Sequence, residues 1–387
     1  MEIFKKELEE LNQKGLVRTL KRIDSAQGPR VTIDRREIIL LSSNNYLGLA
    51  NNTRVKEAAI RAIERYGFGS GASRLISGNT ALHEELEEKI ARFKGTESAL
   101  IFNSGYTANT GVIPALVGKG DFIYSDEFNH ASIIDGSRLS RAEIRIYPHK
   151  DMNSIEDLLK RDAGNGRKLI ITDTVFSMDG DIAPLKEIYE LAMRYDAILM
   201  IDEAHATGVL GKKGRGAIEH FGLENNDIIQ MGTLGKALGT FGAYAAGSKE
   251  LINFFINKSR SFIFTTSLPP AVAAATIEAL NIIEEDVSLI KRLWENRKMF
   301  LEGLHYLGLN TSGSETPIIP VFIGDASKTS KVAQLLYENS VYAPAIRPPT
   351  VPHGSSRIRT TVMATHTIED IEKAIEAFKT VAEWQRK

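Results

Sequence analysis

Two short segments combine residue types that could do chemistry. Asp202-Glu203-Ala204-His205 follows the apolar run 197–201, and Lys236 lies 34 residues after Asp202, in the glycine-rich segment 232–239. A lysine amine among small residues can form a Schiff base with a carbonyl group. A carboxylate beside a ring nitrogen keeps that nitrogen protonated and makes the ring an electron sink. These segments therefore predict a site where Lys236 binds a carbonyl carbon and Asp202 faces a heterocycle.

A third segment could hold phosphate. Ser104-Gly105-Tyr106 follows the apolar run 98–102 and leads into a helical pattern, where free N–H groups at a helix N-terminus favour an anion. Alone, this motif is weak, because most glycine-containing turns between a strand and a helix are only turns. Together with Asp202, His205 and Lys236, however, it resembles the pyridoxal 5'-phosphate (PLP) enzymes with the aspartate-aminotransferase-like fold, fold type I.

Two other site chemistries fit the sequence less well. Asp202-Glu203-Ala204-His205 has the form of the DEAH box of a nucleic-acid-dependent ATPase, which also needs a GxxxxGK[ST] phosphate loop. The nearest match has Gln230 in place of the first glycine and Ala237 in place of the hydroxyl residue. The eight histidines form no HExxH or HxH pair, so we expect no metal site.

Composition narrows the function classes further. The 387 residues include no cysteine, which excludes a disulfide scaffold, a cysteine nucleophile and a thiolate metal site. Lys and Arg (48) almost balance Asp and Glu (49), whereas a general nucleic-acid binder would carry a basic excess. Residues 1–7 are charged and lack the apolar core of a signal peptide, so we expect a cytoplasmic protein.

Alternating strand and helix patterns must position these residues. Several short apolar runs are typical of strands covered by helices on both faces, and alternation of β and α elements favours a mostly parallel sheet. We expect an α/β fold in which ligands bind beyond the carboxyl ends of the strands. The expected strands cover residues 98–102, 122–125, 169–172, 197–201, 228–231 and 243–246.

The C-terminal part has a different pattern. A long helical stretch from 271 to 307, with a break near Val287, precedes two strand-like runs at 318–323 and 358–362 and helices at 328–339 and 368–384. This pattern predicts a smaller α+β domain with its own sheet. We expect an N-terminal arm (1–50), a large PLP-binding domain (51–280) and a small C-terminal domain (281–387), with an amphipathic helix over 2–14 in the arm.

Seven motifs in order resemble the α-oxoamine synthases over nearly the whole chain. They are Ser43-Asn44-Asn45-Tyr46-Leu47-Gly48-Leu49, Gly69-Ser70-Gly71-Ala72-Ser73-Arg74, Asn129-His130-Ala131-Ser132, Phe176-Ser177-Met178-Asp179-Gly180, Asp202-Glu203-Ala204-His205, Gly232 to Gly239, and Arg357-Ile358-Arg359. These enzymes condense an amino acid with an acyl thioester and release carbon dioxide.

The resemblance implies roles for the cofactor-binding residues. Lys236 would bind the cofactor covalently and move the Cα proton, and Asp202 would pair with the ring nitrogen. His130 would stack on the ring, and His205 and Ser177 would lie near its phenolic oxygen. The phosphate would be bound by Gly105, Tyr106 and Thr233.

The resemblance also implies substrate contacts. Asn45 and Arg359 would clamp the amino acid's carboxylate, since arginine offers a bidentate fork, whereas Arg357 would have a structural role. Arg347 or Arg18 could bind a carboxylate at the end of an acyl chain, although either could equally be a solvated surface residue. Thr350 matches a position that contacts the ligand across a subunit interface.

The segment 345–352, Ala-Ile-Arg-Pro-Pro-Thr-Val-Pro, resembles the branch of the family that joins L-alanine to a pimeloyl thioester on coenzyme A or a carrier protein. The branch that joins glycine to acetyl-CoA is the alternative. Family members share active sites across a dimer, so we expect a homodimer in which Thr265 or Thr266 of one chain could reach the phosphate bound by the other. We expect no nucleic-acid or membrane partner.

Overall fold

The computed structural model describes residues 2–13, 16–162, 164, 166–224, 227–311 and 313–386. Contacts divide the chain into two compact units, residues 44–293 and residues 1–43 together with 294–387. The segment that we expected to be an arm thus contributes 43 residues to the same unit as the C-terminal part. The boundaries expected from the sequence for functional domains stay predictions. No helix in the described ranges is both long and apolar enough to cross a membrane.

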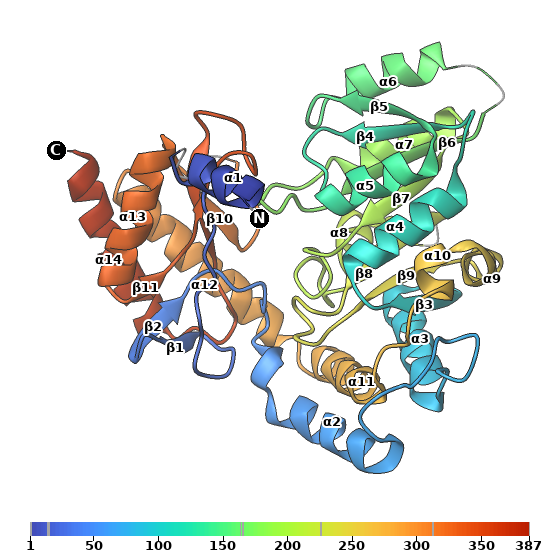
Figure 1. Ribbon diagram of the computed structural model, residues 1–387, viewed down its shortest axis with the longest axis horizontal. Helices are drawn as coiled ribbons and strands as arrows, with labels where there is room; N and C mark the ends of the chain where they lie inside the picture. Colours follow the sequence, from blue (N-terminus) through green and yellow to red (C-terminus); the bar gives the residue numbers. More distant parts are fainter. Residues whose placement is uncertain are drawn as a thin grey trace. The chain divides into compact units, whose positions relative to one another are not determined.

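A seven-stranded sheet forms the centre of the unit 44–293, and its strand order is β3-β9-β8-β7-β6-β4-β5 (Figure 1). Strand β9 runs antiparallel to both of its neighbours, and the other neighbouring pairs are parallel. The strands are β3 (Ser98–Phe102), β4 (Phe122–Asp126), β5 (Glu143–Tyr147), β6 (Lys168–Asp173), β7 (Ile198–Asp202), β8 (Ile228–Thr233) and β9 (Ala243–Gly247).

Helices line this sheet from the edge beside β5, where α6 lies, to the edge beside β3, where α3 lies (Figure 1). Helix α11 packs against α2 and α3, and α4 packs against α5, α9 and α10. The helices of this unit are η1 (Leu49–Asn51), α2 (Thr53–Tyr66), α3 (Ala81–Lys94), α4 (Gly105–Leu116), α5 (Ala131–Ser140), α6 (Met152–Arg161), α7 (Leu185–Arg194), α8 (Ala217–Phe221), α9 (Lys249–Lys258), α10 (Arg260–Ile263) and α11 (Pro270–Glu285).

The core of this unit explains why its strands are apolar throughout. Ile171, Met200 and Met231, from three adjacent strands, are all fully buried in one cluster with Val112 of α4 and Phe255 of α9. Burying apolar surface contributes about 25 cal/mol per Å², so strands covered on both faces need few polar residues along their length. Polar side chains therefore concentrate where the strands end.

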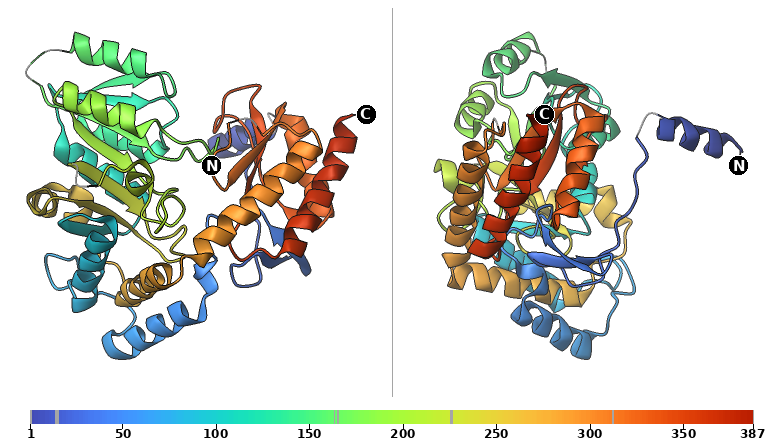
Figure 2. Two further views of the ribbon diagram at one scale, coloured as in Figure 1. Left: turned by 180° about the vertical axis from the view of Figure 1, so that it is seen from behind. Right: turned by 90° about the vertical axis from the view of Figure 1, so that its left-hand side faces the viewer.

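The second unit contains two three-stranded sheets, ordered β1-β2-β11 and β10-β13-β12. Strand β11 pairs in parallel with β2, which joins the two ends of the chain in one unit. Helices α13 and α14 lie side by side (Figure 2). The elements are α1 (Glu2–Gln13), β1 (Arg30–Ile33), β2 (Arg36–Leu40), β10 (Ile318–Gly324), α13 (Ala326–Glu338), β11 (Val341–Tyr342), β12 (Ala345–Ile346), β13 (Ser356–Thr361) and α14 (Ile368–Gln385), while α12 (Ser288–Tyr306) begins in the first unit.

The expected α/β fold is confirmed, including all six strands expected for the sheet and the helix break near Val287. The expected helix over 2–14 is observed from Glu2 to Gln13, and Lys14 lies outside the described residues. Strand β5 was missed. It is an edge strand in which Glu143 is exposed, and so is Ile146, which removes the continuous apolar run that marks the central strands.

Candidate active site

Asp202 is the last residue of β7 and is only 4% exposed. The N–H of Ala204 donates to its Oδ1 at 2.9 Å, and the Asn109 amide donates to its Oδ2 at 3.0 Å. Asn109 belongs to α4 and also donates to the Ser132 hydroxyl at 2.9 Å, so it joins two helices to the carboxylate. A buried carboxylate held by hydrogen bonds in this way is pre-oriented for a cationic or N–H partner.

His130 begins the turn into α5, next to Asp202. Its Nδ1 accepts the N–H of Ser132 at 3.2 Å and lies 2.8 Å from the Ser132 hydroxyl, while its own backbone N–H donates to Asp173 Oδ2 at 2.7 Å. Desolvation lowers the pKa of His130, and the nearby Lys236 charge lowers it further, against the opposing effect of Asp202. The imidazole is therefore held in a fixed place and favours its neutral form, which suits stacking on a ring.

His205 lies within the first turn after Asp202 and is buried. The Tyr46 hydroxyl lies 2.7 Å from its Nδ1, and Tyr46 is fully buried too. The contact fixes the orientation of the imidazole. Ser177 belongs to a tight loop in which Phe176 N–H donates to the carbonyl of Asp181 at 3.1 Å and Gly180 N–H to that of Phe176 at 2.8 Å.

Lys236 lies in the glycine-rich loop after β8. Its charge affects the pKa of both His130 and Asp173, so its amine is near the ends of β4 and β6. Gly239 closes the loop with φ of +66°, and a Cβ at this position would lie 2.3 Å from the Ala50 nitrogen. Only glycine permits this close approach, which keeps Lys236 at the sheet's carboxyl edge.

The expected phosphate residues come together at the start of α4. Ser104 caps the helix by accepting the N–H of Thr107 at 3.2 Å, which leaves the N–H groups of Gly105 and Tyr106 without an acceptor in the part of the chain that the structure describes. A Cβ at Gly105 would lie 2.7 Å from Thr233 Cγ2, so glycine allows α4 and β8 to approach. The exposed Tyr106 side chain is tied to Asp135 by its hydroxyl.

The expected substrate residues divide between the two units. Asn45 belongs to the unit of the sheet, where its Oδ1 accepts the Ala50 N–H at 3.1 Å. Arg359 is buried on β13 in the other unit, as is Arg357, whose guanidinium lies 4.4 Å from the centre of the Phe322 ring.

The remaining three expected residues meet on one surface of that second unit. The exposed Arg18 donates to the Thr350 hydroxyl at 3.3 Å, although 332 residues separate them in the sequence. Thr350 N–H in turn donates to the carbonyl of Arg347 at 3.1 Å. The structure therefore brings the Arg18 side chain to the turn formed by residues 347–350.

Sequence reasoning missed four polar contributors to the site region. Asn109 orients Asp202, Tyr46 contacts His205, Asp173 holds the turn of His130, and Asn129 donates its side-chain amide to the Ile171 carbonyl at 2.9 Å. Tyr46 and Asn129 lie inside the quoted motifs, and that position was the only sign of a role available in the sequence.

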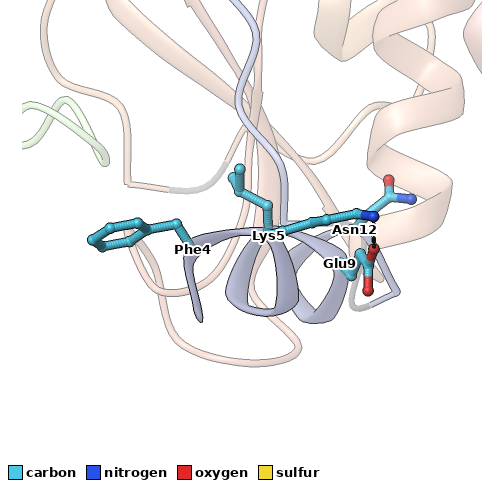
Figure 3. Close-up of a pocket in the computed structure, with 5 residues that line it drawn as sticks. Phe4, Lys5, Glu9 and Asn12 are labelled. Carbon is cyan, nitrogen blue, oxygen red and sulfur yellow. Dashed lines mark ion pairs between the residues drawn. The ribbon is translucent and has the colours of Figure 1, made fainter. Parts of the chain in front are cut away.

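One hollow lies on helix α1 and contains none of these site residues. It measures about 470 Å³ and is lined only by α1, through Phe4, Lys5, Leu8, Glu9 and Asn12. Figure 3 shows Phe4 extending away from the Lys5–Glu9 ion pair, whose atoms are 4.0 Å apart. No residue of this helix is buried, so the hollow is an open helix surface.

This fold, with a lysine, a buried aspartate and a histidine at the carboxyl edge of its sheet, is that of the fold type I PLP enzymes. The chain belongs to the aminotransferase class I and II family, whose model matches residues 36–378. The resemblance to the α-oxoamine synthases is confirmed by its relatives. One, 8-amino-7-oxononanoate synthase of Citrifermentans bemidjiense, is 54% identical over 97% of this chain and 96% of its own.

Two solved structures agree with this placement. Serine palmitoyltransferase from S. paucimobilis, in a variant with a bound PLP–myriocin aldimine, matches with a TM-score of 0.94 and 31% identity, covering 98% of this chain and 97% of its own. The 8-amino-7-oxononanoate synthase of Francisella tularensis matches with a TM-score of 0.78 and 30% identity, covering 90% of this chain and 99% of its own.

The cofactor is PLP, as expected, and the structure of the site fits it. The close approach of Gly105 to Thr233 and the N–H groups at the start of α4 suit a phosphate. The buried Asp202, already oriented by two hydrogen bonds, suits a protonated ring nitrogen. Lys236 supplies the amine that a PLP aldehyde requires.

Proposed function

We propose that the chain joins L-alanine to a pimeloyl thioester, with release of carbon dioxide and the thiol, to give 8-amino-7-oxononanoate, an intermediate on the way to biotin. The chain is thus a PLP-dependent acyltransferase. The observation that carries the proposal is the convergence of Asp202, His130 and Lys236 at one edge of the sheet, in a chain 54% identical to a relative of that name.

Each residue of the site contributes a separate part of the reaction. PLP, when bound, supplies a ring that takes up the electrons left at the amino acid's Cα. The Lys236 amine would bind the cofactor covalently and would move the proton of the amino acid's Cα. Asp202 would keep the ring nitrogen protonated, and His130 would cover the ring face. His205 and Ser177 would bind the phenolic oxygen.

The substrate carboxylates need cations at two places. The resemblance to the α-oxoamine synthases assigns Asn45 and Arg359 to the carboxylate of the amino acid, which leaves as carbon dioxide. The cluster of Arg18, Arg347 and Thr350 binds the far carboxylate of the pimeloyl chain, and the hydrogen bond from Arg18 to Thr350 supports treating them as one group. A dicarboxylic chain that ends in a charge benefits from such a cluster, whereas an acetyl group has nothing for it to bind.

Thiol release with two substrate pairs tests the proposal. L-alanine with pimeloyl-CoA should turn over much faster than glycine with acetyl-CoA. Because a hydrophobic pocket distinguishes one methyl group by only about 1–3 kcal/mol, the acyl group should dominate the preference. A preference for glycine and acetyl-CoA would assign the chain to glycine C-acetyltransferase and refute the proposed substrates.

We also propose that the enzyme is a homodimer with shared active sites, and a cytoplasmic location stays a prediction. Thr265 Oγ1 and the Thr266 carbonyl accept hydrogen bonds from the Asn103 amide at 3.2 and 2.8 Å, which anchors this segment beside the start of α4. Sedimentation of the PLP-loaded protein should give the mass of a dimer. An active, cofactor-loaded monomer would contradict this part of the proposal.

A further inference from the structure

Asp202 has a second carboxyl group beside it. Asp173 ends β6, Asp202 ends β7, and the two residues are register partners in adjacent parallel strands. Neighbouring strands lie about 4.8 Å apart, and side chains at paired positions point to the same face. Asp173 is 6% exposed and Asp202 is 4% exposed. Two adjacent carboxylates in such a place would repel each other strongly if both were ionised.

The hydrogen bonds distinguish the two carboxyl groups. Asp202 accepts two, one from the Ala204 N–H and one from the Asn109 amide. Asp173 accepts one on Oδ2, from the backbone N–H of His130 at 2.7 Å. Among the residues that the structure describes, Asp173 has no ion-pair partner within 4.0 Å. Asp202 is therefore the better-stabilised anion of the two.

The charged groups that face Asp173 act in opposite directions. Burial raises the pKa of Asp173 well above its ordinary value, and Asp202 on β7 and Asp126 on β4 add to the increase. The N–H of His130 and the more distant charge of Lys236 oppose it, without cancelling it. The surroundings thus favour a neutral Asp173 over an ionised one.

We propose that Asp173 is a protonated carboxylic acid in the folded enzyme, so that the carboxyl pair carries a single negative charge, located on Asp202. Asp173 is then a positioning residue. Its unprotonated oxygen accepts the N–H that fixes the turn of His130, and its neutrality leaves Asp202 as the one anion that faces the ring nitrogen. This inference concerns the protein alone and does not depend on which amino acid or acyl thioester the enzyme uses.

The pH dependence of stability provides a test in the cofactor-free protein. A carboxyl group that stays protonated when folded, but ionises near pH 4 when unfolded, makes the folded state less stable as pH rises. Asp173→Asn cannot ionise in either state. From about pH 5 to 7, the folding equilibrium constant of the unsubstituted protein should therefore fall relative to that of Asp173→Asn, by about tenfold per pH unit.

A matched control is Asp157→Asn, because Asp157 lies on α6 with its side chain 64% exposed. Its folding equilibrium constant should change with pH in the same way as that of the unsubstituted protein. The same pH dependence in Asp173→Asn as well would show that Asp173 is ionised and would overturn the proposal.

Infrared spectroscopy tests the proton directly. At neutral pH the cofactor-free protein should show the C=O band of a protonated carboxylic acid, retained in Asp202→Asn and lost in Asp173→Asn. Absence of the band from the unsubstituted protein would refute the proposal even if Asp173→Asn failed to fold. Persistence of the band in a folded Asp173→Asn would assign the proton to another residue and refute it too.

The loaded enzyme provides a functional readout. Exchange of the alanine Cα hydrogen for deuterium should fall much less in Asp173→Asn than in Asp202→Asn, because the amide keeps the acceptor for His130 and adds no charge. In Asp202→Asn it should fall by about 100-fold or more, in line with the loss of a general acid–base or electrostatic group. Equal losses in the two variants would contradict the single-charge arrangement.

Discussion

Asp202 and Glu203 are consecutive residues, yet their carboxylates have opposite surroundings. Asp202 lies at the site, and its hydrogen-bond donors among the described residues are neutral, the Asn109 amide and the Ala204 N–H. Glu203 is fully buried and forms an ion pair with Lys94, and its Oε1 also accepts the N–H groups of Ala217 and Ile218 at 2.9 and 3.3 Å. Asp202 ends β7 and Glu203 follows the strand, and the two carboxylates have different partners.

The difference shows how one segment serves both binding and stability. Burial lowers the pKa of the Lys94 ammonium, but the attraction of Glu203 outweighs this effect and the pKa is raised overall. Lys94 also donates to the carbonyl of Arg215, so this pair ties α3 to the loop that follows Asp202. The charge of Glu203 is matched within the protein, whereas that of Asp202 is left for a ligand.

The largest effect should come from removing the side-chain amine of Lys236. Lys236→Ala should abolish turnover and the visible absorbance of lysine-bound PLP, because no other group takes the place of the amine in binding the cofactor or moving the Cα proton. Circular dichroism of the cofactor-free variant should show that it still folds, so that the loss of turnover can be assigned to the missing amine. Retained turnover would refute the assignment of this lysine.

Breaking the buried ion pair between Lys94 and Glu203 should instead lower the stability of the fold. Lys94→Met leaves the Glu203 carboxylate buried and without its cation, which should cost about 3–5 kcal/mol of unfolding free energy. Denaturant unfolding of the cofactor-free protein measures this change. PLP added to the surviving folded fraction should still react with Lys236.

An exposed ion pair provides the control for that variant. Lys373 and Glu369 on α14 are 2.6 Å apart, with side chains 55% and 65% exposed. Lys373→Met should therefore leave the free energy of unfolding almost unchanged. Equal losses of unfolding free energy in Lys94→Met and Lys373→Met would mean that burial does not increase the contribution of the Lys94–Glu203 ion pair to stability.

The sequence predicts features that depend on local patterns, but not contacts between distant segments. The strands, the acid after β7 and the lysine after β8 follow from local patterns, because parallel strands bring their carboxyl ends to one edge. Lys94 and Glu203 are 109 residues apart, and 93 residues separate Asn109 from Asp202. Nothing in the local spacing predicts such contacts, since they depend on how α3 and α4 pack against the sheet. The role of Asp173 depends likewise on the register of β6 and β7.

The half-buried His149 lies between these two extremes, because its charge can titrate. His149 bridges Asp126 at 2.9 Å and Asp181 at 2.8 Å, next to the loop of Ser177. Burial lowers the pKa of His149, but the hydrogen bonds to the two carboxylates outweigh it and raise the pKa to about 9. Like Glu203, it is matched by charges of the protein itself, but its own charge disappears in alkaline solution.

The smallest of the expected effects concerns this histidine. Because its pKa is higher in the folded state, its contribution is complete below about pH 6.5 and is lost as pH rises through about 9. The unsubstituted protein should thus lose about 3 kcal/mol relative to His149→Gln between about pH 6.5 and 9.5 in chemical unfolding. His220→Gln, at an exposed histidine beside Phe221, should show no such difference. If the His149→Gln curve stays parallel to that of the unsubstituted protein, the bridge holds a neutral imidazole, and the two aspartates must be stabilised by Lys150 and backbone N–H groups instead.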